Sequence, residues 1–212
     1  MYVHAAFAID EAAALEFAGR IGFGQLTAFD GARPIGVHLP FLLTGAAGAV
    51  RIEFHVARGN AIAALADGRA EMLLTITGPD SYISPDWYVS KEQVSTWLYE
   101  AVHLTGPVRR LGSAETLGHV DRLTAKFETW LLPKPPWTSR KLSEQRRAML
   151  LGGIIAMEMQ VTRIEGQRKL NQHKSDADHL AIARALEGSG CPPDREIAAA
   201  MRGLRPGLDY GP

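Results

Sequence analysis

Apolar and polar residues alternate strictly through residues 49–57. Four apolar side chains occupy every second position, and the positions between them carry Arg51, Glu53 and His55. A period of two is that of a β-strand, whose successive side chains point to opposite faces of a sheet. The pattern therefore predicts a strand with one packed face and one face directed at solvent or a ligand.

Similar patterns predict further strands at residues 25–29, 35–43, 71–78 and 99–111. The first two of these are joined by a turn that contains Asp30 and Gly31. Pro40 has no N–H for a central ladder, so it indicates an edge, a bulge or a split in the sheet. A short helix over 61–66 interrupts the strands. Such a series favours a small antiparallel barrel, and hence a mainly β fold with added helices, of the α+β class.

Helical patterns flank this strand-rich region. A helix over 11–20 begins after Asp10, and a long helix over 113–131 follows the fifth strand. The proline-rich segment 133–137 is the clearest internal boundary. It predicts a division into a barrel with its helices, 1–132, and a C-terminal extension, 133–212. The extension is expected to hold a helix over 139–150, a strand over 155–162 that returns to the barrel, and a helical tail at 177–186 and 194–201.

Composition narrows the functional classes. Of the 212 residues, 46% are hydrophobic and 22% are charged, which is typical of a globular protein. Lysine plus arginine and aspartate plus glutamate both number 23, so any DNA-binding surface must be local or built by pairing subunits. The single cysteine, Cys191, excludes an intramolecular disulfide and fits a reducing compartment. The N-terminus lacks the pattern of a secretory signal, and no apolar run approaches a membrane span. These features predict a cytoplasmic protein without membrane association.

Five ordered stretches give the sequence a family resemblance. They are HLPFLL (38–43), HVARGN (55–60), GPDSYISPDWYVSK (78–91), STWLYEAVH (95–103) and RIEGQRKLNQHKSDAD (163–178). Together they resemble the PaiB-like family of FMN-binding negative transcriptional regulators. The resemblance implies a split β-barrel, a homodimer with FMN at the subunit junction, and a role in negative transcriptional control. The sequence departs from the family pattern at Leu98, where a polar amide is expected, and at Gly59, where alanine is expected.

The chemistry of FMN assigns expected roles to residues in these stretches. The phosphate requires N–H donors and a cation where a strand ends and a helix begins, which selects His55, Ala57, Arg58 and Asn60. The ring requires an apolar slot with backbone groups, which selects His38, Leu39, Pro40 and Phe41. The aromatic segment 79–97 adds Trp87 and Trp97 for stacking and Ser84 and Lys91 for anionic groups. The alternatives are a solvated Arg58, an Asn60 that only caps a helix, a Phe41 in the core, and aromatic residues that pack in the core or a dimer interface.

Other chemistry has less support in the sequence. Segment 183–201 has a helix-turn-helix outline, but its second helix is alanine-rich and is expected to pack rather than read bases. The better local DNA candidates are Arg140, Lys141, Arg146 and Arg147, with a solvated basic face as the alternative. No nucleophile motif or metal site is predicted, and His55 and His103 are expected to be hydrogen-bonded barrel residues. Two functions remain beside repression, a flavin-dependent oxidoreductase and a non-catalytic flavin or haem sensor.

Overall fold

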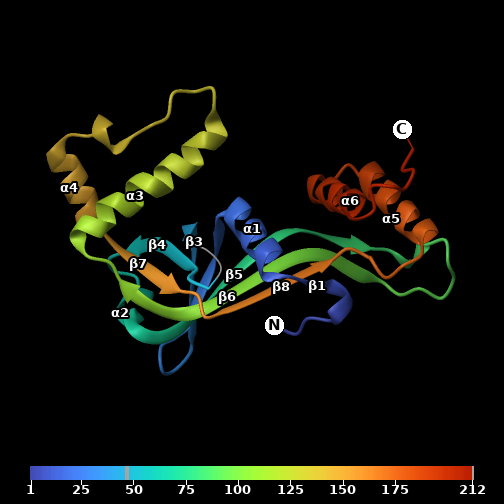
Figure 1. Ribbon diagram of the computed structural model, residues 1–212, viewed down its shortest axis with the longest axis horizontal. Helices are drawn as coiled ribbons and strands as arrows, with labels where there is room; N and C mark the ends of the chain where they lie inside the picture. The colour runs from blue at the N-terminus through green and yellow to red at the C-terminus, as the bar shows by residue number, and fades with distance from the viewer. Residues whose placement is uncertain (46–47, 212) are drawn as a thin grey trace. The chain divides into compact units, whose positions relative to one another are not determined.

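The computed structural model describes residues 1–45 and 48–211, and its strands pair in the order β1-β8-β6-β5-β2-β3-β4-β7, with β6 also pairing with β7 (Figure 1). The strands are β1 (Ala8–Ile9), β2 (Phe23–Phe29), β3 (Pro34–Thr44), β4 (Arg51–Ala57), β5 (Asp67–Ile83), β6 (Thr96–Arg110), β7 (Ile154–Gln160) and β8 (Arg163–Lys169). The α-helices are α1 (Glu11–Ile21), α2 (Ile62–Leu65), α3 (Ser113–Glu128), α4 (Glu144–Gly152), α5 (Asp176–Gly188) and α6 (Pro192–Leu204). Short 3₁₀ helices are η1 (Ala5–Phe7), η2 (Pro85–Trp87), η3 (Thr129–Leu131) and η4 (Ser139–Lys141). The expected mainly β, α+β fold class is confirmed.

The chain forms two compact units that interleave along the sequence. The barrel unit comprises Leu15–Ile76 and His103–Ile164, and the terminal unit comprises Met1–Ala14, Thr77–Val102 and the chain from Glu165 onward. The units do not follow the expected boundary between residues 132 and 133, because the long strands β5 and β6 each contribute to both. Each unit is described separately below.

The strands of the barrel unit close into a ring. The order β6-β5-β2-β3-β4-β7 returns to its start because β7 pairs with β6 as well as with β4. Met159 of β7 takes part in both pairings, since it lies opposite Ile52 of β4 on one side and Val108 of β6 on the other. The predicted return of the segment after the proline-rich boundary to the barrel is therefore confirmed.

Pro40 marks the position at which β3 changes partners. From Pro34 to Pro40 the strand pairs with β2, and from Phe41 to Thr44 it pairs with β4. Because proline cannot donate to a ladder, it is tolerated where one set of pairings ends and the next begins. This confirms the split expected from the sequence.

The alternation in β4 also appears as predicted. Ile52 and Phe54 are fully buried in the barrel, whereas Glu53 and His55 lie on the opposite face and are half-buried. The barrel core is completed by large apolar side chains from the neighbouring strands, Leu26, Leu39, Phe41, Leu74, Ile76, Leu104 and Met157. The outer face of β4 is thus left for the helices of the barrel unit.

Several element boundaries differ from the sequence expectations. Residues 79–83, expected as irregular loop, continue β5, and β6 begins at Thr96 rather than at Tyr99. The strand β8 was not predicted, because its sequence RIEGQRK lacks apolar alternation. In the sheet β8 lies between β1 and β6, with Gln167 opposite Ala8 of β1. Pairing with neighbouring strands therefore set the secondary structure of these segments, whose local sequence signals are weak.

The terminal unit has its own core around α5 and α6. Ile182 and Leu186 of α5 pack with Ile197 and Met201 of α6, all fully buried. The second helix of the helix-turn-helix outline is therefore a packing element, as expected. Leu98, which replaces the polar amide of the family pattern, is fully buried in the same cluster. Every helix in the described part of the chain is too short or too polar to span a lipid bilayer.

Candidate functional site

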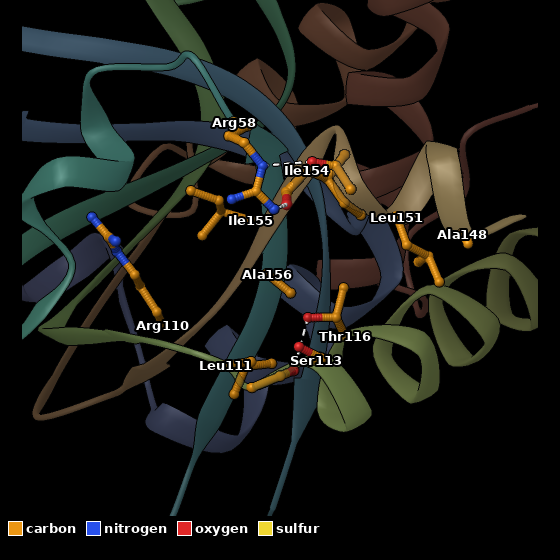
Figure 2. Close-up of a pocket in the computed structure, with 12 residues that line it drawn as sticks. Arg58, Arg110, Leu111, Ser113, Thr116, Ala148, Leu151, Ile154, Ile155 and Ala156 are labelled. Atoms are coloured by element: carbon orange, nitrogen blue, oxygen red, sulfur yellow. Dashed lines mark hydrogen bonds between the residues drawn. The ribbon is translucent and has the colours of Figure 1, made fainter.

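The barrel unit contains a cavity of about 450 Å³ where strand ends meet two helices (Figure 2). Its walls come from the end of β4, the end of β6, the start of α3, the C-terminal half of α4 and the start of β7. The volume lies within the range of small-molecule sites in proteins. We call this space the flavin cavity, after the FMN-binding role that we propose for it below.

Arg58 forms one cationic side of the flavin cavity. Its Nε donates to the carbonyl of Gly152, and its Nη2 donates to the carbonyl of Ile154 over 3.2 Å. The Arg58 backbone N–H also donates to the carbonyl of Gly153 over 2.8 Å. These bonds orient the guanidinium group without neutralising it, because carbonyls carry no formal charge.

Arg110 supplies a second cation to the same cavity. Its Nε and Nη2 both donate to the carbonyl of Ala63, over 3.0 and 2.7 Å. Within residues 1–45 and 48–211, neither Arg58 nor Arg110 has a carboxylate at ion-pair distance. The charge of each guanidinium group is therefore not neutralised, and a guanidinium group of this kind is a donor fork suited to phosphate.

The N-terminus of α3 lies at the same cavity. Gly112 and Ser113 line it, and Thr116 donates its hydroxyl to the carbonyl of Gly112 over 2.9 Å. The first turn of a helix presents unpaired N–H groups and a partial positive charge. Glu115 already accepts from the Gly112 N–H, and this bond lowers the pKa of Glu115 below its ordinary value. The remaining cavity wall is apolar, with Leu111, Leu151, Ile154, Ile155 and Ala156. This combination fits a phosphate joined to a flat apolar ring.

A second cavity, of about 240 Å³, adjoins the first and shares Leu151 and Ile154 with it. We call it the histidine cavity, because His55 of β4 lines it. The Nδ1 atom of His55 lies 3.0 Å from Nε2 of His119, a fully buried residue of α3. The Nδ1 atom of His119 lies 3.3 Å from a carboxylate oxygen of Glu53. A relay thus runs from the half-buried Glu53 carboxylate through two imidazole rings to the histidine cavity.

Electrostatics define the protonation of this relay. Burial and, to a smaller extent, the neighbouring His55 lower the pKa of His119 to about 4, against the opposing effect of Glu53. Burial also lowers the pKa of His55. Arg122 pairs with Glu53 over 2.6 Å. Both imidazole rings are therefore neutral at pH 7.

The expected cofactor residues of the barrel unit fall into three environments. Arg58 lines the flavin cavity, and Ala57 precedes it at the end of β4. His55 lines the histidine cavity instead, and its Nδ1 lies 3.0 Å from Nε2 of His119. The side chain of Asn60, two residues before the start of α2, accepts from the N–H of Ile62 over 3.0 Å.

The HLPF segment does not bring its side chains to either cavity. Leu39 and Phe41 belong to the buried barrel core, as the sequence alternative for Phe41 foresaw. His38 is exposed and stacks on Phe23, with ring centroids 6.4 Å apart. Pro40 lies at the partner change in β3. Any contact of Leu39 and Phe41 with a ligand must therefore use backbone atoms.

The other four expected residues belong to the terminal unit. Ser84 caps η2 by accepting from the N–H of Asp86, and Trp87 packs against the apolar cluster of α5 and α6. Lys91 is exposed. Trp97 is 52% exposed and meets Tyr82 edge to face, with ring centroids 6.2 Å apart. These residues remain expectations for the site.

Sequence reasoning missed Arg110, the start of α3 and His119. Arg110 and Gly112 were recognisable as a basic strand end followed by a helix start, which is a common anion-binding arrangement. His119 gave a weaker signal, a lone histidine within an amphipathic helix. Its pairing with His55 depends on the packing of α3 against the outer face of β4, which no local pattern encodes.

Comparison with known proteins identifies the family and the fold of this chain. A family model described as "Putative FMN-binding domain" matches residues 1–163. The chain is 28% identical over 202 residues to "Protease synthase and sporulation protein PAI 2" of Bacillus subtilis, covering 95% of this chain and 96% of that protein.

Two solved structures share the fold at low identity. One is the FAD and haem binding protein of Mycobacterium smegmatis, with a TM-score of 0.54 and 17% identity over 86% of this chain and 79% of that one. The other is a flavocytochrome of Azotobacter vinelandii, with a TM-score of 0.53 and 10% identity over 77% of this chain and 69% of that one. Their likeness confirms the split-barrel fold. With its family model matched over most of the sequence, the chain belongs to the FMN-binding domain family, whose cofactor is FMN.

Proposed function

We propose that this protein is an FMN-binding negative transcriptional regulator that acts as a homodimer. The observation that carries the proposal is that helix α4 both lines the flavin cavity and carries basic residues. Ala148 and Leu151 of α4 line the flavin cavity, while its first turns carry the basic residues Arg146 and Arg147. Occupancy of the cavity and exposure of a basic surface are thereby linked through one helix.

In this proposal Arg58 and Arg110 bind the FMN phosphate. Leu151, Ile154 and Ile155 exclude water from one side of the ring. Bound FMN supplies a redox-active and light-absorbing ring system. The chain's own contribution is to hold the phosphate with two guanidinium groups that backbone carbonyls already orient.

The DNA-binding surface is proposed to lie on η4 and α4. Arg140, Lys141 and Arg146 are exposed, and Arg147 is half-buried. Ser143 starts α4 by accepting from the N–H of Arg146 over 3.2 Å, which sets the basic residues on an ordered segment. Phosphate contacts of this kind provide most of the affinity of a sequence-independent encounter with DNA.

A second copy of the chain is proposed to cover an apolar row after α3. Trp130, Leu131 and Leu132 are 60%, 54% and 61% exposed. Consecutive exposed apolar residues are typical of interfaces rather than of solvated surfaces. Pairing would also double the basic surface of a chain with no net charge. Light scattering should give twice the chain mass, and Leu131→Glu should shift it to the monomer.

A fluorescence-anisotropy titration with a DNA fragment from the protein's own promoter tests the regulator. The triple variant Arg140→Ala, Lys141→Ala, Arg146→Ala should weaken DNA binding. The affinity should also depend less steeply on salt concentration, by an amount that corresponds to the loss of up to about three phosphate contacts. Arg195→Ala serves as the matched control, since Arg195 is exposed on α6, the packing helix of the rejected helix-turn-helix outline. Absence of DNA binding at low salt, with and without FMN, would refute regulation while leaving FMN binding intact.

A flavin-dependent oxidoreductase is the second candidate. It is favoured by the relay of Glu53, His119 and His55, because redox chemistry on a flavin requires proton delivery. Anaerobic addition of NADH or NADPH to the FMN-loaded protein distinguishes the two candidates. Bleaching of the flavin absorbance at a catalytic rate would favour the enzyme, and an unchanged spectrum would remove it. A non-catalytic haem sensor would instead show a haem absorption band on titration.

A further inference from the structure

The histidine cavity has features of a ligand site that FMN binding leaves unused. Its walls are apolar side chains from α3 and α4, among them Leu117, Val120 and Leu150, and the indole of Trp137. At about 240 Å³ it is larger than an engineered cavity of about 150 Å³ that holds benzene. One substituted aromatic ring therefore fits, whereas a flavin or a haem requires more room.

The relay fixes which hydrogen-bonding group His55 offers to this cavity. The Glu53 carboxylate can only accept, so His119 carries its proton on Nδ1 and leaves Nε2 bare. His119 Nε2 must then accept from His55 Nδ1–H. The remaining nitrogen, His55 Nε2, is an acceptor, and among the described residues it has no hydrogen-bond partner. A ligand at His55 must therefore donate a hydrogen bond.

Arg147 supplies a charge to the same cavity. It is half-buried and lines the cavity, and no described carboxylate lies within ion-pair distance of its guanidinium group. A cation beside apolar walls attracts a carboxylate strongly, because the surrounding dielectric is lower than that of water. Ser139, which is buried and lines the cavity, adds a hydroxyl.

We propose that the histidine cavity binds a small phenolic carboxylic acid. The aromatic ring lies among the apolar residues against Trp137, the phenol donates to His55 Nε2, and the carboxylate pairs with Arg147. The site is separate from the flavin cavity, although Leu151 and Ile154 contribute to both. If the proposed DNA-binding function holds, ligand binding would also withdraw Arg147 from DNA and weaken repression. The binding itself does not depend on that function.

Calorimetric titration of the FMN-saturated protein tests the proposal with three probes. They are 4-hydroxybenzoate, benzoate, which lacks the donor, and phenol, which lacks the carboxylate. We expect 4-hydroxybenzoate to bind about tenfold more tightly than either, because each lost group leaves one polar partner unsatisfied. Flavin fluorescence recorded in the same samples shows whether FMN stays bound.

Two variants connect binding to the named residues. Arg147→Met should reduce affinity for 4-hydroxybenzoate about tenfold and leave phenol binding unchanged. Arg146→Met is the matched control, since Arg146 is adjacent on α4 but is not part of the cavity wall, and it should leave all three affinities unchanged. His55→Phe should abolish the preference for 4-hydroxybenzoate over benzoate. Circular dichroism confirms folding of each variant.

Three outcomes would overturn the proposal. One is the absence of binding by 4-hydroxybenzoate up to millimolar concentration. A second is release of FMN during the titration, which would place the acid in the flavin cavity. The third is an equal loss of affinity in Arg146→Met and Arg147→Met, which would indicate a general charge effect. None of these results bears on DNA binding, so failure here is distinguishable from failure of the proposed regulator.

Discussion

The side chains of His55 and His119 meet at 3.0 Å although 64 residues separate them in the chain. His55 projects from the outer face of β4, and His119 projects from α3, with the two rings nearly perpendicular at 71°. Glu53 lies two residues before His55 and therefore on the same face of β4. Its carboxylate contacts Nδ1 of His119. Two side chains of a strand and one side chain of a helix thus form one chain of polar contacts.

The relay predicts a specific pH dependence of stability. The pKa of His119 is lowered to about 4 in the folded protein, so between pH 6.5 and 4 the unfolded chain binds a proton that the folded chain does not. The free energy of unfolding should therefore fall as pH falls through this window, by about 3 kcal/mol from His119 alone. Urea unfolding at several pH values measures it.

His119→Gln isolates this contribution from that of the other histidines. The variant should be less stable at pH 7.5, and its free energy of unfolding should vary less between pH 6.5 and 4 than that of the parent. Glu53 and Arg122, which face His119, are unchanged in this variant. An identical pH profile in both proteins would contradict the assignment.

The flavin cavity predicts that its two arginines contribute to FMN affinity. Arg58→Met and Arg110→Met should each raise the dissociation constant of FMN roughly tenfold to a hundredfold, the usual value of a charge-assisted contact. Arg109→Met is the control, because Arg109 already pairs with Glu115 and Glu158. Flavin fluorescence titration measures the FMN dissociation constant of all three variants. An equal loss of FMN affinity in the Arg109 variant would argue for a general charge effect.

Closure of the barrel predicts the cost of adding one methyl group at Gly106. A Cβ there would lie 1.9 Å from the carbonyl oxygen of Gln160, so β6 and β7 would have to separate. Gly106→Ala should lower the free energy of unfolding by roughly 2 kcal/mol or more. In contrast, a Cβ at Gly59 has no neighbour within 4 Å, and Gly59→Ala should be neutral or slightly stabilising. Chemical denaturation measures the stability of both variants. A similar loss of stability in both would refute the close contact of β6 and β7 at Gly106.

Asp178 is predicted to hold the loop after η2 in the terminal unit. It is buried, and its carboxylate accepts from the N–H groups of Val89 and Ser90 at 2.9 Å and from the Ser90 hydroxyl at 2.7 Å. Asp178→Ala should lower the free energy of unfolding by roughly 1–3 kcal/mol. Hydrogen exchange at residues 89 and 90 should accelerate with it.

Asp176→Ala provides the comparison for Asp178→Ala on the same helix. Its carboxylate pairs with Arg205 over 2.6 Å but is 68% exposed, so the loss should be at most about 1 kcal/mol. If both variants lose the same stability, or if exchange at residues 89 and 90 is unchanged, the loop is held by other contacts.

The sequence by itself determined the local elements and the cofactor class. Alternation around Phe54 identified β4, the missing N–H of Pro40 identified the partner change in β3, and the ordered motifs identified the family. These inferences succeed because a strand period, a proline constraint and a motif are properties of adjacent residues.

Only the tertiary structure decided the long-range relationships. It paired β8 with β1, placed Arg110 with Arg58 in one cavity, and brought His119 to His55. The physical reason is that a side chain's partner depends on ring closure and on how a helix packs across a strand. Both are set by the burial of the whole core, and neither leaves a periodic signal in the chain.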